Sequence, residues 1–139
     1  MTFIGRITAP ASSAEVSCTG PRVLEFKMYG QVSRSILNDV LAQAADLLRN
    51  HPEMDTTVWD FSEYTGYEPG TTAVAIRWSR EHLKRFTHSV VITRSHVVRG
   101  LARVGQLMIP WIKVEVVACR EDVSAVLQEI HRVGGRSAA

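Results

Sequence analysis

Hydrophobic and polar positions follow two periods along the chain, and each change of period marks a new predicted element. In RVLEFKMYGQVS, residues 22–33, apolar and polar positions alternate, which is typical of a strand covered on one face. In SRSILNDVLAQAADLLRN the apolar residues recur at helical spacing behind Ser33 or Ser35 as the cap. The same criteria predict strands over residues 2–8, 14–18, 22–33, 56–61, 88–94 and 111–119, and helices over residues 33–50, 71–86, 95–109 and 120–133.

The order of these elements predicts an α/β fold. After the first helix, strands and helices alternate, which favours parallel strands joined by crossover helices. We expect a single-layer mixed sheet, mostly parallel, with an antiparallel edge from the early strands and about four helices packed on it. Residues 1–21 are expected to form an N-terminal strand and turn extension, residues 22–133 the α/β domain, and residues 134–139 a disordered tail.

The composition agrees with one domain that needs neither disulfides nor metal. The chain has 139 residues, of which 45% are hydrophobic, enough to bury a core. Cys18 and Cys119 stand apart from any CxxC pair, so we expect reduced thiols, with a bridge between them as the alternative. The N-terminus has no unbroken apolar segment and no run is long enough to span a bilayer, so we expect a cytoplasmic protein.

Charge is unevenly distributed although the net charge is only +2. Residues 1–68 hold nine acidic and five basic residues, whereas residues 69–139 hold five acidic and eleven basic ones. The second half of the chain is therefore expected to carry a basic surface. Such a surface either binds an acidic partner or is simply a face exposed to solvent.

The helix predicted over residues 71–86 has a basic outer face. Its apolar side holds Ala75, Trp78, His82 and Phe86, and its outer side holds Arg77, Arg80, Glu81 and Lys84. Arg99 and Arg103 lie one turn apart on the polar side of the next helix, so the two helices can present one positive surface. A nucleic-acid role is not favoured, because the sequence shows no recognised module and no exposed aromatic residues between the basic ones.

The densest group of polar side chains follows the strand VWDF. Ligands of open α/β sheets bind at the carboxyl ends of the strands, where SEYTGYEPGTT begins. Thr71 or Thr72 is the expected N-cap of the next helix, whose first amide groups favour an anion such as phosphate. The candidate binding residues are Asp60, Ser62, Glu63, Tyr64, Tyr67, Thr71, Thr72, Arg77 and Arg80. In the structural alternative, Asp60 and Ser62 form a side-chain turn, the tyrosines cover the sheet edge, and the threonines only cap.

The motifs of the commonest chemistries are absent from the sequence. It contains no GxSxG, no GxGxxG after a strand, no GxxxxGK[ST], no HExxH and no Cys/His ligand grouping, so we expect no catalytic residue, cofactor or metal. An enzyme of unknown reaction is the alternative, with Asp60, Glu63, Glu68 or His82 as acid/base groups. The apolar segment 104–111 fits a buried core or the lining of a lipid-binding cavity.

The element order, with a strand ending in DFS, a polar turn and a helix beginning near Thr71, resembles the STAS domain family, in particular its SpoIIAA-like branch of small stand-alone bacterial proteins. The resemblance covers about residues 22–133. It implies a mixed sheet with helices packed on it and a non-enzymatic binding role. STAS domains bind protein partners, and some relatives bind nucleotides or lipids.

The same resemblance bears on phosphorylation. In anti-sigma-factor antagonists of the family, an Asp-x-Ser strand end leads to a DSSG segment whose second serine is phosphorylated. Asp60 and Ser62 match the first part, and Gly70 takes the place of the phosphorylated serine. Thr71 and Thr72 are the nearest hydroxyl groups that could replace it.

These observations predict a regulatory binding module that contacts a protein or a small ligand through the turn 60–72 and the following helix. The alternatives are a phosphorylation-controlled regulator with Thr71 or Thr72 as acceptor, a lipid or nucleotide carrier, and the enzyme considered above. A homodimer is a further alternative, because apolar residues at a strand edge or helix face often pair by two-fold symmetry.

Overall fold

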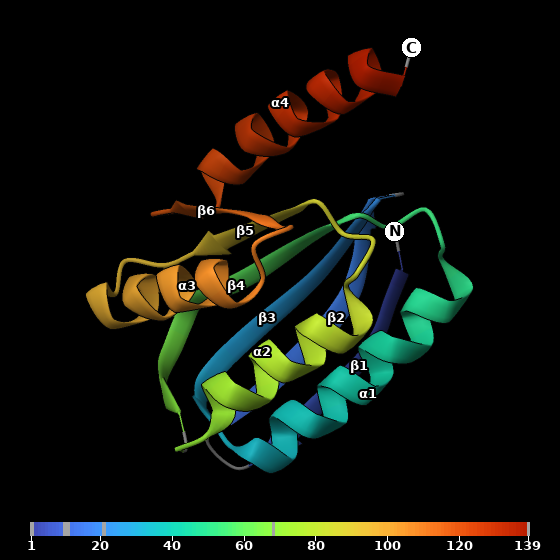
Figure 1. Cartoon of the computed structure of the whole chain (residues 1–139). Coiled ribbons are helices and arrows are strands. Elements are labelled where there is room, and N and C mark those ends of the chain that lie inside the picture. The colour runs from blue at the N-terminus through green and yellow to red at the C-terminus, as the bar shows by residue number, and fades with distance from the viewer. Residues whose placement is uncertain (1, 10–11, 21, 68, 139) are drawn as a thin grey trace.

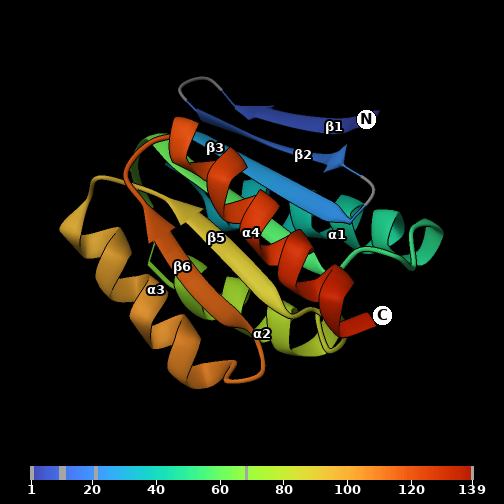
Figure 2. The same cartoon turned by 90° about the horizontal axis from the view of Figure 1, so that it is seen from above.

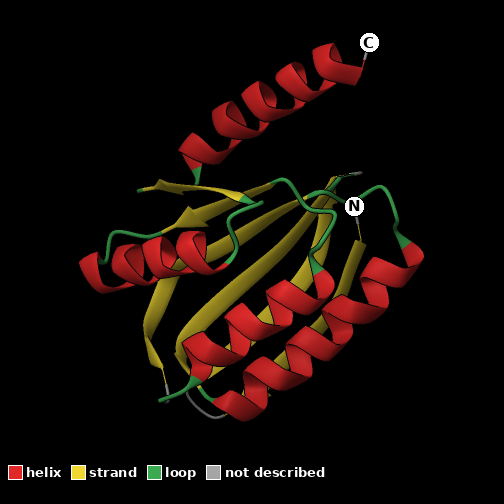
Figure 3. Cartoon of the chain, in the orientation of Figure 1, coloured by secondary structure: helices red, strands yellow, loops and turns green. Residues whose placement is uncertain are grey.

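Six strands form one sheet in the order in which they occur along the chain (Figures 1 and 3). The structure is a computed structural model that describes residues 2–9, 12–20, 22–67 and 69–138, with side chains described for residues 13–20, 22–66 and 69–132. The strands are β1 (Thr2–Ala9), β2 (Ser12–Gly20), β3 (Val23–Val32), β4 (Thr56–Tyr67), β5 (His88–Ile92) and β6 (Lys113–Val117). The pairs β1·β2 and β2·β3 are antiparallel, and β3·β4, β4·β5 and β5·β6 are parallel. The predicted mixed sheet with an antiparallel edge is confirmed.

Three helices cover one face of the sheet and a fourth covers the other. The helices are α1 (Arg34–Asn50), α2 (Thr71–His82), α3 (His96–Met108) and α4 (Glu121–Ala138). Strands β3 to β6 advance across the sheet in one direction, and right-handed crossovers then place all three connecting helices on the same side. Helix α4 follows the last strand and folds back over the opposite face (Figures 1 and 2).

Serine caps begin two of these helices, as predicted. The hydroxyl of Ser33 accepts a hydrogen bond from the Ile36 amide at 3.1 Å, and that of Ser95 accepts one from the Val98 amide at 3.3 Å. Each bond satisfies an amide group that lacks a partner within its own helix.

The alternation of side chains along the strands builds two separate cores. Phe26 of β3 stacks on Trp59 of β4 with 4.0 Å between ring centroids and meets Trp78 of α2 edge-on at 5.9 Å. These rings belong to the larger core, under α1 to α3. The smaller core, under α4, consists of Val23, Val58, Val90, Ile92, Val123 and Ile130.

The early strands belong to the same sheet and share the larger core. Strand β2, expected only as a brief strand over residues 14–18, has nine residues and pairs along its length with β3. Ala14 and Val16 are fully buried in the larger core. The small polar residues around them carry weak strand propensity, but a neighbour on each side supplies the backbone partners that stabilise the strand.

Three element boundaries differ from prediction by more than two residues. Strand β4 runs to Tyr67 because its second half pairs with the end of β3, with Tyr64 opposite Gly30. Helix α2 ends at His82 rather than near residue 86. Helix α4 continues to Ala138, so the tail expected over residues 134–139 is helical where it is described. Extending an existing helix adds a hydrogen bond for each residue ordered, which favours continuation.

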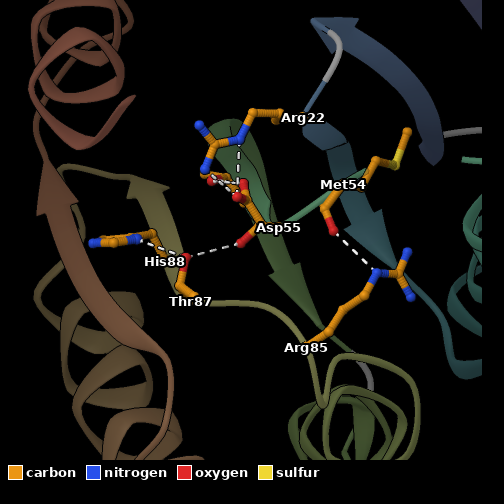
Figure 4. Close-up of polar contacts among 7 residues, drawn as sticks. Arg22, Met54, Asp55, Arg85, Thr87 and His88 are labelled. Carbon is orange, nitrogen blue, oxygen red and sulfur yellow. Dashed lines mark hydrogen bonds and ion pairs between the residues drawn. The ribbon is translucent and has the colours of Figure 1, made fainter. Parts of the chain in front are cut away.

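Polar contacts connect the loops at the amino ends of the strands (Figure 4). Arg22 donates from Nε to Oδ2 of Asp55 at 2.9 Å, and the Thr87 amide donates to the Asp55 carbonyl at 2.9 Å. Arg85 donates to the carbonyls of Met54 and His51, both at 3.2 Å. These hydrogen bonds and the ion pair between Arg22 and Asp55 hold the loops at this end of the sheet together.

Candidate functional site

A pocket of about 160 Å³ lies between the sheet and the helices α2 and α3, and it is partly open to solvent. Its floor is formed by strand residues such as Trp59 and Val91. Its walls come from α2, α3 and the segments around them. The lining residues are Met28, Val32, Leu37, Thr57, Trp59, Phe61, Tyr64, Thr71, Thr72, Ala75, Ile76, Ser79, Leu83, Ser89, Val91, Val98, Leu101, Ala102, Gly105, Ile109, Ile112 and Val114.

Small side chains create this space. Ala75 on α2 and Ala102 and Gly105 on α3 line the pocket where larger residues would fill it. A Cβ atom added at Gly105 would meet no atom within 4 Å, apart from its chain neighbours and its own helix backbone. Because protein cores are normally filled to crystal-like density, an unfilled apolar volume of this size points to a ligand.

The pocket is apolar apart from a few hydroxyl groups, and those of Thr57, Ser79 and Ser89 are hydrogen-bonded within the protein. Thr57 donates from Oγ1 to Oγ of Ser89 at 2.9 Å, and Ser79 donates from Oγ to the Ala75 carbonyl at 2.8 Å. No charged residue lines the pocket within the described residues. Such a lining favours an uncharged, mainly apolar ligand or the apolar part of a larger one.

The predicted site residues separate onto the two faces of the sheet. Tyr64 lines the pocket and packs edge-on against Phe61, with ring centroids 5.1 Å apart. Asp60 lies on the α4 side and is 1% exposed; its Oδ1 accepts hydrogen bonds from the amide of Ser62 at 2.9 Å and from its hydroxyl at 2.6 Å. Glu63 is exposed. Asp60 and Ser62 thus form the local side-chain turn that was the structural alternative.

Two predicted side chains lie outside the described residues. Tyr67 is described only by its backbone, which pairs with Val32 of β3. Glu68 is outside the described residues altogether.

The predicted cap of α2 is wrong, because the N-cap is Gly70. This glycine has φ of 91°, a left-handed conformation that residues with a Cβ atom rarely adopt, and it provides no side-chain cap. Thr71 is the first helical residue and is 6% exposed, whereas Thr72 is half-buried. Both threonines line the pocket instead of capping the helix.

The remaining candidates lie apart from one another. Arg77 and Arg80 are exposed on the outer face of α2, as predicted. His82 stacks on Trp78 at 4.8 Å, and its Nδ1 lies 3.0 Å from the Trp78 carbonyl oxygen. His82 is therefore on the α2 side of the sheet and Asp60 on the α4 side, so these two of the proposed acid/base groups do not meet.

Sequence reasoning missed a charged cluster under the start of α4, which we call the Arg120 cluster. It consists of Glu25, Asp60 and Arg120. Nη2 of Arg120 donates to both carboxylate oxygens of Glu25, at 2.7 and 2.8 Å, and Nη1 donates to Oδ2 of Asp60 at 3.0 Å. The hydrogen bonds to Glu25, together with both negative charges, raise the pKa of Arg120. The only hint in the sequence was the acidic residue Glu25 on a strand face that also carries Val23.

Lys27 adds a second positive charge beside this cluster. It lies opposite Asp60 in the β3·β4 register. Burial by itself lowers the pKa of Lys27, but the neighbouring Tyr29, Asp60 and Glu63 give a net rise. The two buried carboxylates are thus matched by two cations, and the arrangement is that of a structural ion-pair network.

Metal and membrane-spanning sites are not found in the described residues. No group of three or more His, Cys, Asp or Glu residues there could hold a metal ion. None of the helices in that part of the chain has the length and hydropathy needed to cross a bilayer.

Comparisons with known proteins agree with this architecture. An uncharacterised protein of SpoIIAA-like fold from Shewanella loihica PV-4 superposes with a TM-score of 0.67 and 13% identity, over 84% of this chain and 94% of that one. The anti-sigma factor antagonist SpoIIAA in its unphosphorylated form gives a TM-score of 0.63 at 11% identity, over 88% of this chain and 98% of that one. The phosphorylated Bacillus cell fate determinant SpoIIAA gives 0.58 at 11% identity, over 81% and 98% of the two chains.

A search of curated proteins found no match. The family model described as SpoIIAA-like matches residues 23–126, which include β3 to β6, the three crossover helices and the start of α4. The chain therefore belongs to the SpoIIAA-like family, whose fold is related to that of anti-sigma factor antagonists.

Proposed function

We propose that this protein is a binding module that takes a small apolar ligand into the pocket between the sheet, α2 and α3. The observation that carries the proposal is an open volume of about 160 Å³ lined almost entirely by carbon. A buried cavity of about 150 Å³ accommodates a benzene ring. The fitting ligand is therefore an aromatic ring or a short aliphatic chain, with any polar group directed toward the opening.

The position of the pocket also supports a regulatory role. Tyr64, Thr71 and Thr72 come from the end of β4 and the start of α2, the stretch for which a partner-binding role was predicted. A ligand in the pocket would contact both this stretch and α3. Occupancy would favour one spacing of α2 and α3 over others, and so change the outer face that a partner protein meets.

Filling the pocket tests the proposal. In Gly105→Leu the new side chain occupies the open space, whereas Gly100→Leu, on the exposed side of the same helix, adds the same atoms outside it. Both changes raise helix propensity by about 1 kcal/mol, so the pair is matched in its effect on the helix. The probes are benzene, indole and hexanol, titrated while methyl NMR signals of the pocket residues are followed.

We expect a Kd on the order of 0.1–1 mM for the best probe, because only a few apolar atoms are buried. Gly105→Leu should weaken binding at least about tenfold, and Gly100→Leu should leave it unchanged. The proposal would be contradicted if no probe shifted the methyl NMR signals of the unsubstituted protein in a saturable way. Native mass spectrometry of freshly purified protein is the direct way to find a ligand carried from the cell.

Phosphorylation at Thr71 or Thr72 is less well supported than ligand binding. Thr71 is 6% exposed, so a kinase would reach its hydroxyl only after the start of α2 opens. Added phosphate there would bring about −1.5 to −2 charges into an apolar lining. Phosphopeptide analysis of protein from its native cell would reveal the modification, and its consistent absence would rule against this form of regulation.

A further inference from the structure

The large hydrophobic side chains that remain exposed gather on one element. Within the part of the chain that the structure describes they are Val97, Val104, Leu107, Met108 and Trp111, with exposed fractions of 61%, 46%, 79%, 44% and 41%. The first four belong to α3, and Trp111 follows its end. At 100° per residue the four helix positions fall within an arc of about 100°. A continuous exposed stripe of this kind, unlike scattered residues, marks an interaction surface.

The exposed stripe belongs to a well-fixed part of the fold. The opposite side of α3 packs into the protein through Val98. The side chain of Gln106 donates to the Ile112 carbonyl at 2.6 Å and accepts from the Val114 amide at 2.7 Å, which fixes the turn from α3 to β6. Trp111 donates from Nε1 to the Leu83 carbonyl at 3.1 Å, so its polar atom is satisfied while much of its ring remains exposed.

Cations flank the stripe and outnumber the acids around it. The sequence from His82 to Val114 contains no aspartate or glutamate, but six lysines and arginines. On the helical wheel Arg99 and Arg103 lie between the stripe and Gln106, and no ion pair engages them among the described residues.

The other border of the stripe is also basic. There, Arg77 and Arg80 of α2 line a shallow groove together with Val104 and Met108 of α3, and Glu81 is the one acid among its described lining residues. We call the stripe and its four flanking arginines, Arg77, Arg80, Arg99 and Arg103, the α3 surface.

We propose that the α3 surface docks on the surface of an anionic lipid bilayer, with α3 lying parallel to the membrane plane. The aliphatic side chains and the indole would enter the boundary between headgroups and acyl chains, while the arginines meet lipid phosphates. Charge complementarity selects this occupant over a second copy of the chain, since two-fold pairing of the same surface would bring cations against cations. The proposal is independent of what occupies the pocket.

Cosedimentation with lipid vesicles tests this surface. The vesicles are phosphatidylcholine containing about one-third phosphatidylglycerol, with pure phosphatidylcholine as the neutral reference. We expect binding to the anionic vesicles, weaker binding to the neutral ones, and a decline with added salt. Leu107→Gln should lower the partition coefficient by about tenfold or more. The double variant Arg99→Gln/Arg103→Gln should lower it by roughly 25-fold, about a factor of five for each cation removed.

A charge-matched control separates this surface from general attraction. Arg49→Gln/Arg132→Gln removes the same charge from α1 and α4, and should leave vesicle binding close to that of the unsubstituted protein. Trp111 fluorescence should be quenched by brominated acyl chains, and Trp111→Phe should remove that quenching. Because Leu107 and both arginine pairs are exposed, circular dichroism should show unchanged folding.

Three results would overturn the proposal. The first is no cosedimentation with anionic vesicles at low salt. The second is an equal loss of binding in the control pair. The third is a protein dimer, detected by sedimentation equilibrium, that Leu107→Gln dissociates in the absence of any vesicle binding.

Discussion

Replacing Arg120 by methionine should strongly destabilise the protein. Methionine keeps much of the apolar stem but removes the guanidinium, so Glu25 loses hydrogen bonds of 2.7 and 2.8 Å and Asp60 loses one of 3.0 Å. The side chains of Glu25 and Asp60 are 8% and 1% exposed, so water can replace little of what they lose. Two carboxylates would then remain buried without their main cation.

The structure allows the size of this effect to be worked out. Removing one partner of a buried ion pair costs about 3–5 kcal/mol. Two features reduce the cost here: the Arg120 side chain is 49% exposed, and Asp60 keeps its bonds from Ser62. We therefore expect the free energy of unfolding to fall by about 2–3 kcal/mol. For a chain of this length that corresponds to a decrease in Tm of about 6–12 °C.

Urea unfolding of four proteins measures the interaction: the unsubstituted chain, Arg120→Met, Glu25→Gln and the double variant. Glutamine removes the unpaired charge, so the double variant should be more stable than the sum of the single changes predicts, by about 1–2 kcal/mol. Arg132→Met is the matched control on α4, because Arg132 pairs with Glu129 in solvent and should change stability little. An Arg120→Met protein within about 0.5 kcal/mol of the unsubstituted one would refute the reasoning.

Two further predictions concern backbone conformation and pH. Gly70→Ala should lower the free energy of unfolding by about 1 kcal/mol, because alanine is strained at φ of 91°. Gly100→Ala, whose added Cβ meets no atom within 4 Å, should raise it by up to about 1 kcal/mol. Thermal unfolding compares the two variants, and equal effects would contradict the reasoning. Burial, assisted by the charge of Lys113, lowers the pKa of His88, so the unfolded chain binds this proton more readily. The free energy of unfolding should therefore decrease as the pH falls below about 6.5 and through the folded-state pKa of His88. In urea unfolding, His88→Asn should show a smaller decrease over the same pH range. An unchanged dependence on pH would count against this assignment.

Much of the fold could be predicted because its signals are local. The alternation around Leu24 and Phe26, the helical stripes and the caps Ser33 and Ser95 each depend on residues within a few positions of one another. The order of elements then restricts the topology, because right-handed crossovers leave few ways to connect parallel strands.

The site itself depended on packing that no local pattern contains. The pocket exists because small residues on α2 and α3, Ala75, Ala102 and Gly105, come together above the sheet. Segment 104–111, expected either in the core or lining a cavity, places Gly105 and Ile109 in the pocket lining but exposes Leu107, Met108 and Trp111 to solvent. Periodicity alone cannot tell which side of an amphipathic helix has a neighbour.

The sequence by itself determined the type and order of the elements, because backbone propensity, capping and periodicity act over a few residues. Only the tertiary structure decided how far β4 extends, which hydroxyls enter the pocket, and that Arg120 pairs with Glu25 across 95 positions. Such contacts depend on where complete strands and helices lie relative to one another, and that arrangement is set by the packing of the whole chain.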